Sequence, residues 1–277
     1  MTGRRLIVGL FLIGFLSGIA SASVGDRPGS VLGPGYHLGA KYFLNYAPDF
    51  KNIIVSPFHW KTRDALLFGG TTALIGVLYA YDGDIGNWVM DHRSFTSNGT
   101  TRFLSHFAEP PAMFGLMTAM YASGEIFDKP GLRRTALLSL EAYILHTSTS
   151  SVIKFFAGRL RYSEGQGPHA LRPFEIRFVK TSFPSGHSGS IFAVATVIAG
   201  ESGSWPVGVL AYGVAGLTAL SRLHDNEHWA SDILAGSALG FFFGTMVRHF
   251  NPRGGAAGAP NLAVGLGPAS LSVSFRF

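Results

Sequence analysis

The chain is 277 residues long, with 47% hydrophobic and only 14% charged residues, so we expect one well-buried domain with modest extensions and exclude a disordered chain. The net charge of +6 comes from scattered basic residues without a Lys/Arg-rich run, which argues against nucleic-acid binding and favours a basic site for an anionic substrate. Because the chain contains no cysteine, disulfides, thiolate zinc sites and cysteine nucleophiles are also excluded.

The N-terminus has the layout of a secretory signal peptide. Arg4 and Arg5 precede an apolar run over residues 6–16, and small residues lead to a cleavage site expected after Ala22. We therefore predict a signal peptide over residues 1–22 and export to the bacterial cell envelope. An uncleaved membrane anchor is the alternative, although the apolar run is short for a membrane span.

Residues 23–63 contain turn formers and aromatic residues without a sustained period, and we interpret them as an N-terminal extension that packs on the domain. The domain itself is expected over residues 64–250. No β-rich or alternating βα pattern occurs there, so the fold class predicted is an all-α bundle of about six core helices. The apolar segments of helical length are Asp64–Tyr81, Pro111–Phe127, Thr135–Gly158, Ser188–Gly200, Pro206–Leu223 and His228–Phe250. A more polar, amphipathic stretch, Ile85–Phe107, lies between the first two.

The last of these segments has a distinctive face. His228, Asp232, Gly236, Gly240 and Gly244 follow one another at intervals of four residues, so they are expected on one side of a helix. Glycines let a neighbouring backbone come close. The alignment predicts a buried face that carries two ionisable side chains at its N-terminal end.

Residues 251–277 change character and are predicted to be a β tail. Leu271, Val273 and Phe275 alternate with serines, which is the pattern of a half-buried strand. This strand could form a hairpin with Asn261–Leu266 through Gly267-Pro268, but pairing with the N-terminal extension is favoured. One or two strands cannot close a barrel.

The segment Pro184-Ser185-Gly186-His187 begins an apolar helix. Backbone N–H groups at a helix N-terminus and the helix dipole attract anions such as phosphate, and Pro suits a first turn. His187 could donate a proton to a leaving oxygen. Taken alone, however, the segment is equally typical of an ordinary helix cap.

His228 and Asp232 are one helical turn apart, so the carboxylate could fix the tautomer of the imidazole and leave its other nitrogen free as a nucleophile or ligand. A purely structural pair is as common. Arg222 offers a planar fork for phosphate oxygens. Lys154 and Arg161, with Arg159 between them, lie at the end of an apolar helix, where cations often serve only the helix dipole.

Together, these residues form three motifs in a fixed order: Lys-x6-Arg at 154–161, Pro-Ser-Gly-His at 184–187, and Ser-Arg-x5-His-x3-Asp at 221–232. The combination resembles the type 2 phosphatidic acid phosphatase superfamily, which also contains bacterial class A acid phosphatases and vanadium haloperoxidases. The resemblance covers roughly Asp64 to Phe250. The second and third motifs match at every defining position. The first has Tyr162 where the family usually has Pro, a departure that concerns loop rigidity and substrate fit more than catalysis.

The resemblance implies a role for each motif residue. His228 would attack phosphorus to form a phosphohistidine, Asp232 would orient it, and His187 would protonate the leaving group. The phosphate oxygens would be held by Lys154, Arg161, Ser185, Gly186 and Arg222. No metal or other cofactor is implied, since the cations supply the electrostatic stabilisation, and vanadate would act as an inhibitor. The implied enzyme is a phosphoric ester hydrolase acting on phosphomonoesters or diphosphates, with a phosphorylated lipid favoured over a small phosphate ester.

Two other functions share these motifs. In a vanadium-dependent haloperoxidase, vanadate would be the cofactor in the same site with His228 as its ligand. A non-catalytic envelope protein could retain only the fold, but it would be expected to lose the charged positions, which are all present here. Substrate specificity is expected in the stretch Ile85–Phe107 and in the loop from Tyr162 to Thr181.

The predicted cellular location of the protein depends on whether its N-terminus is a cleaved signal peptide. Six apolar segments would suit an integral inner-membrane protein, but a cleaved signal would then place the motifs on the cytoplasmic side. The third segment also contains Glu141, His146 and Ser148. The opposite ends of the segments are flanked by Arg133, Arg134, Arg248 and Arg253. These would fit a cytoplasmic face only without the signal peptide. We favour a periplasmic domain associated with the membrane surface, with an integral protein as the alternative.

Overall fold

The computed structural model describes residues 36–252, except for 45, 93–94 and 178, together with two strands in the tail. The predicted signal peptide, residues 1–22, and the first part of the extension lie outside the described residues. The elements and their order are α2 Ala40–Leu44, α3 Tyr46–Val55, α4 Thr62–His92, α5 Phe95–His106, α6 Pro110–Ile126, α7 Pro130–Ala157, α8 Gly186–Ser202, α9 Trp205–His224, α10 Ala230–Phe250, β1 Asn261–Gly267 and β2 Ser270–Arg276. Short 3₁₀ turns occur at Ser56–His59 and Tyr162–Glu164.

The predicted all-α bundle is confirmed, and each of the six apolar segments forms a helix. Prolines begin α6 and α7 and lie in the first turn of α9, where the missing N–H has no cost. Gly158 ends α7 in the left-handed conformation, with φ of 56°. The first helix is longer than expected: α4 continues through Asp82 to His92, so the first eight residues of the polar stretch Ile85–Phe107 belong to it.

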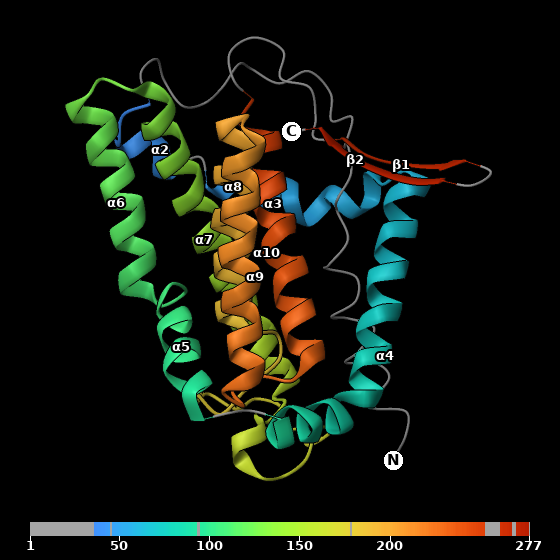
Figure 1. Ribbon diagram of the computed structural model, residues 1–277. Helices are drawn as coiled ribbons and strands as arrows, with labels where there is room; N and C mark the ends of the chain where they lie inside the picture. The colour runs from blue at the N-terminus through green and yellow to red at the C-terminus, as the bar shows by residue number, and fades with distance from the viewer. Residues whose placement is uncertain are drawn as a thin grey trace.

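The core of the bundle consists of α7, α8, α9 and α10, with α4 on one side and α5 and α6 on the other (Figure 1). The predicted glycine face of α10 packs directly on the backbone of α8. A Cβ atom on Gly240 would lie 2.0 Å from the carbonyl oxygen of Gly189, and one on Gly236 would lie 2.3 Å from that of Ser185. This close approach brings the N-terminal ends of α8 and α10 together.

The extension packs on the opposite end of the bundle. The hydroxyl of Tyr42 donates a hydrogen bond of 2.6 Å to the carbonyl of Leu137 in α7, and Asn251 at the end of α10 donates one of 2.9 Å to Asp49. In the tail, β1 and β2 form the antiparallel hairpin that the sequence left as the second choice, with Val264 opposite Val273. The favoured pairing with the extension is not found among the described residues.

Two of the arginines that flank the helices opposite the motifs are paired with a carboxylate, and of these Arg134 is buried and Arg248 is half-buried. Glu201 at the end of α8 accepts hydrogen bonds from Arg134 at 2.8 Å and from Arg248 at 3.2 Å. These charges therefore connect α7, α8 and α10 inside the protein. They are not free to interact with lipid head groups, which weakens the argument that they mark a cytoplasmic face.

Three helices in the described part of the chain, α4, α9 and α10, are long and apolar enough to cross a membrane. Almost none of the apolar stretch of α4 is buried, and side chains such as Leu66 and Trp88 are exposed. On α9, Val209, Leu210 and Leu217 are exposed in the same way. Apolar surface this extensive marks a contact with lipid or protein. The protein is membrane-associated.

Candidate active site

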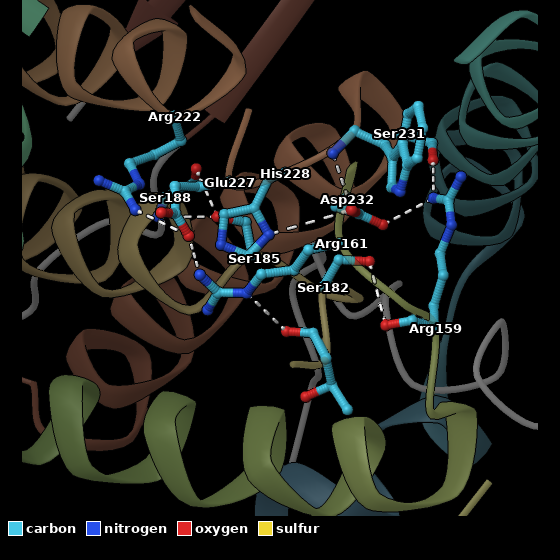
Figure 2. Close-up of polar contacts among 12 residues, drawn as sticks. Arg159, Arg161, Ser182, Ser185, Ser188, Arg222, Glu227, His228, Ser231 and Asp232 are labelled. Atoms are coloured by element: carbon cyan, nitrogen blue, oxygen red, sulfur yellow. Dashed lines mark hydrogen bonds and ion pairs between the residues drawn. The ribbon is translucent and has the colours of Figure 1, made fainter. Parts of the chain in front are cut away.

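The three motifs converge at one end of the bundle, the lower end in Figure 1. Lys154 comes from the last turn of α7, and Arg161 from the loop that follows. Residues 185–187 form the N-terminus of α8, Arg222 lies in the last turn of α9, and His228 precedes α10. The close packing of α8 on α10 thus brings together residues that are up to 78 positions apart in the motifs (from 154 to 232). Figure 2 shows how the side chains from these elements face one another.

His228 lies at the centre of this cluster, with 2% of its surface exposed. Within the described part of the protein, neither ring nitrogen has a hydrogen-bond partner. Burial lowers its pKa well below the usual range, and the nearby positive charges of Lys154, Arg161 and Arg222 add to the effect. The imidazole is therefore neutral at pH 7, with a lone pair available to attack an electrophile.

Asp232 lies beside His228 but not on the same helix face, which corrects the sequence-based prediction. Helix α10 begins at Ala230, because the Asp232 carboxylate accepts a hydrogen bond of 2.9 Å from the backbone N–H of Trp229 and so caps the helix. His228 precedes this cap. Its Nδ1 lies 3.9 Å from Asp232 Oδ2, beyond hydrogen-bond length, so a small rotation of the imidazole is needed to bring the two together.

Three cations surround His228. Lys154 Nζ donates to the carbonyls of Thr181 and Ser182, each at 3.2 Å, which fixes its position. Arg161 Nε donates to the Thr181 carbonyl at 3.3 Å. Burial, and then the neighbouring Arg222, lower the pKa of Arg161 to about 10, so its guanidinium stays charged. Burial, and then the neighbouring Arg161, lower the pKa of Lys154 to about 7, and a bound anion would raise it again. Cationic side chains this close together favour the binding of a multiply charged anion.

The N-terminus of α8 faces the same space. Ser185 is the N-cap: its Oγ accepts a hydrogen bond from the Ser188 N–H at 3.3 Å and lies 2.9 Å from Ser188 Oγ. The sequence placed Pro184 in the first turn of the helix, but Pro184 lies before the N-cap. Because Ser185 Oγ is buried and already paired, the helix N-terminus would bind an anion mainly through backbone N–H groups. Gly186 lies next to Lys154, since a Cβ on it would be 3.9 Å from Lys154 Cε.

His187 is half-buried in the first turn of α8. Burial lowers its pKa to about 3, helped by the charges of Arg222, Arg161 and Lys154. In the absence of an anion, it is therefore neutral. A bound phosphate would offset the three cations and raise this pKa again, which is the condition a proton donor requires.

The sequence did not assign two residues that complete the site, Arg159 and Asp82. Arg159 is buried between two carboxylates and donates to Asp232 Oδ1 and to Asp82 Oδ2, each at 2.7 Å. Asp82 comes from the middle of α4 and also accepts a hydrogen bond of 3.0 Å from the Ser231 N–H. The apolar segment was expected to end at Tyr81, so Asp82 fell just outside it and no sequence pattern identified it.

The Tyr162 ring packs beside α4 at a position where the helix has no side chain. Its ring packs on that of Trp229, with centroids 5.1 Å apart, and its hydroxyl lies 3.3 Å from Asn87 Oδ1. A Cβ on Gly86 would come within 3.1 Å of the Tyr162 ring, so the glycine provides the space. The residue that departs from the expected Pro therefore fixes the loop against Trp229, the N-cap of α10.

Comparisons with known proteins found one matching family model and several similar proteins. Residues 135–255, which contain all three motifs, match the family model of the PAP2 superfamily. A lipid A 1-phosphatase of Porphyromonas gingivalis is 46% identical over 68 residues, 24% of this chain and 15% of that protein. A PA-phosphatase related-family protein of Dictyostelium discoideum is 30% identical over 130 residues, 42% of this chain and 48% of that protein. The matches thus span less than half the length of these curated relatives.

Two solved structures are similar over a larger part of the chain. A transmembrane PAP2-type phosphatidylglycerolphosphate phosphatase from Bacillus subtilis aligns with a TM-score of 0.49 at 18% identity, covering 65% of this chain and 94% of that one. LpxE of Aquifex aeolicus aligns with a TM-score of 0.46 at 17% identity, covering 60% and 93%.

Proposed function

We propose that the chain, whose residues 135–255 match the family model of the PAP2 superfamily, is a metal-independent phosphatase that hydrolyses phosphorylated lipids through a phosphohistidine on His228. The observation that carries this proposal is the state of His228, which is buried and neutral and lies among three cations with both nitrogens unpartnered in the described structure. A nucleophile in that position needs an anionic electrophile, and a phosphate group meets this requirement.

The proposed reaction has two steps. Lys154, Arg161 and Arg222 hold the phosphate oxygens with the N–H groups of α8, and His228 attacks phosphorus while the bond to the ester oxygen breaks. His187 gives its proton to that oxygen. In the second step His187 takes a proton from water, which attacks phosphorus, breaks the P–N bond and releases inorganic phosphate. The cations stabilise the charge that spreads over the phosphate oxygens in both transition states.

A lipid substrate is supported by the membrane association of the chain and by its similarity to a protein named as a lipid A 1-phosphatase. The site itself recognises only the phosphate group. The test is phosphate release by the purified chain, with a chelator present, from phosphatidic acid, a polyprenyl diphosphate, lipid A and a small phosphate ester.

We expect release from at least one lipid and a reduction of about 100-fold in kcat/KM for Arg161→Ala. Arg177→Ala, an exposed arginine in the same loop, is the matched control and should behave like the unchanged protein. Halide oxidation after addition of vanadate, without phosphate release, would instead identify a haloperoxidase. The proposal would also fail if Arg161→Ala and Arg177→Ala had the same activity.

We further propose that α4, α9 and α10 cross the bilayer, which places the site at one membrane face. The exposed apolar side chains of α4 and α9 support an integral protein over the surface association that the sequence favoured. We expect the chain to remain in the membrane pellet after a carbonate wash at high pH and to require detergent for extraction. Release by the wash would contradict the spans. An N-terminal tag retained in the mature protein would contradict cleavage after Ala22, and with it the predicted signal peptide.

A further inference from the structure

The space that a phosphate would occupy already contains one carboxylate, that of Glu227. Its Oε2 forms an ion pair with Arg161 Nη1 and lies 3.6 Å from Arg222 Nη2. Figure 2 shows the carboxylate between the two guanidinium groups and beside His228. Glu227 thus contacts two of the three cations proposed to hold the substrate.

The backbone and the side chain of Glu227 differ in how firmly they are held. The backbone N–H donates to the Arg222 carbonyl at 3.1 Å, within the turn that connects α9 to His228. The side chain is 34% exposed, whereas the arginine side chains are only 14% and 10% exposed. The carboxylate can therefore rotate into solvent without any rearrangement of the backbone, while the arginines stay in place.

A carboxylate and a phosphate group make the same demand on an arginine, since both accept hydrogen bonds from its planar N–H groups. The two cannot share Arg161 and Arg222 at full strength. Glu227 also offsets one positive charge of the cluster formed by Lys154, Arg161 and Arg222.

We propose that Glu227 competes with phosphate for Arg161 and Arg222, and so weakens the binding of every phosphate group, the product included, by a common factor. This inference rests on the proposed function. A phosphorylated lipid retains affinity through its apolar part, whereas inorganic phosphate has no other contact and is released. The carboxylate returns to the arginines as the product leaves, which limits inhibition by phosphate.

The test is the affinity for inorganic phosphate of the full chain in detergent, measured by calorimetry and by inhibition of lipid hydrolysis. Glu227→Gln keeps the shape and removes the charge. We expect its dissociation constant and its inhibition constant for phosphate to fall by about three- to tenfold. Asp128→Asn is the control for net charge, because Asp128 precedes α7 at the opposite end of the bundle with its side chain 90% exposed, and its constants should not change. Thermal unfolding of each variant verifies that the fold is retained.

A positioning role for Glu227 would change the affinity for phosphate in the opposite direction. If Glu227 holds the arginines in position for the substrate, Glu227→Gln will bind phosphate more weakly, and the inference is wrong. Equal affinity of Glu227→Gln and the unchanged chain, or the same gain in Asp128→Asn, would also overturn it. Failure of the unchanged chain and of Glu227→Gln to bind phosphate, with no hydrolysis of any phosphorylated lipid, would instead remove the proposed function on which the inference depends.

Discussion

Replacement of His228 by alanine should reduce phosphate release by about 10⁴-fold or more, because the attacking nitrogen and the covalent intermediate are lost together. The fold should tolerate the change better than the activity does, since neither ring nitrogen of His228 makes a hydrogen bond in the described structure. His59→Ala is the matched control: His59 is an exposed histidine in the turn Ser56–His59, outside the site, and its loss should leave the rate unchanged.

The covalent step can be observed directly. With a substrate whose leaving group needs no proton, His187→Ala should still transfer phosphate to His228, but it lacks the base that activates water. We therefore expect a burst of product equal to the enzyme concentration, together with a protein-bound phosphate that survives alkali and is lost in acid. His187→Ala/His228→Ala should give neither signal. Hydrolysis by His228→Ala at a rate near that of the unchanged protein would refute the phosphohistidine mechanism.

The sequence predicted the six helices well because each is a continuous apolar segment bounded by prolines, glycines or polar residues. The glycine spacing along residues 236–244 also predicted that a neighbouring backbone approaches the last helix, but not that this neighbour is α8. Helix ends were less certain. The first turn of α10 depends on the Asp232 carboxylate, which caps Trp229, and a side-chain cap of this kind shifts a boundary by two residues without any change in the apolar pattern.

The sequence predicted only part of the active site, because it shows which residues lie at helix ends but not which segments pack together. Motif residues such as Lys154, Arg161 and Arg222 are charged residues at the ends of apolar helices, so their positions along the chain reveal the end of the bundle to which they belong. Asp82 and Arg159 are 77 residues apart, and only the packing of α4 against the loop after α7 brings them together. Glu227 looked like part of a polar turn. Its contact with Arg161 and Arg222 depends on the packing of the loop after α7, the end of α9 and the turn before α10, which a local sequence pattern does not show.

Arg159 should affect turnover rather than binding, because it touches the carboxylates behind His228 and no described contact connects it to the phosphate-binding cations. It holds Asp232 Oδ1 while Asp232 Oδ2 faces His228, so its planar fork sets the angle of the carboxylate that orients the nucleophile. Lysine keeps the charge but cannot bridge two carboxylates in this geometry. We expect Arg159→Lys to lower kcat by about 10- to 100-fold with little change in KM.

Lysine substitutions at Arg159 and Arg161 should affect different kinetic constants. Arg161→Lys should raise KM, since it removes contacts made to the phosphate group itself, and Arg177→Lys should change neither constant. A purely structural role for Arg159 would lower the melting temperature and the amount of active protein, but the molecules that remain folded would have the kcat of the unchanged chain. Asp82→Asn provides the second measurement. With one carboxylate neutral, Arg159 is drawn more strongly to Asp232, whose hold on the His228 imidazole weakens, so kcat should fall again while KM stays constant.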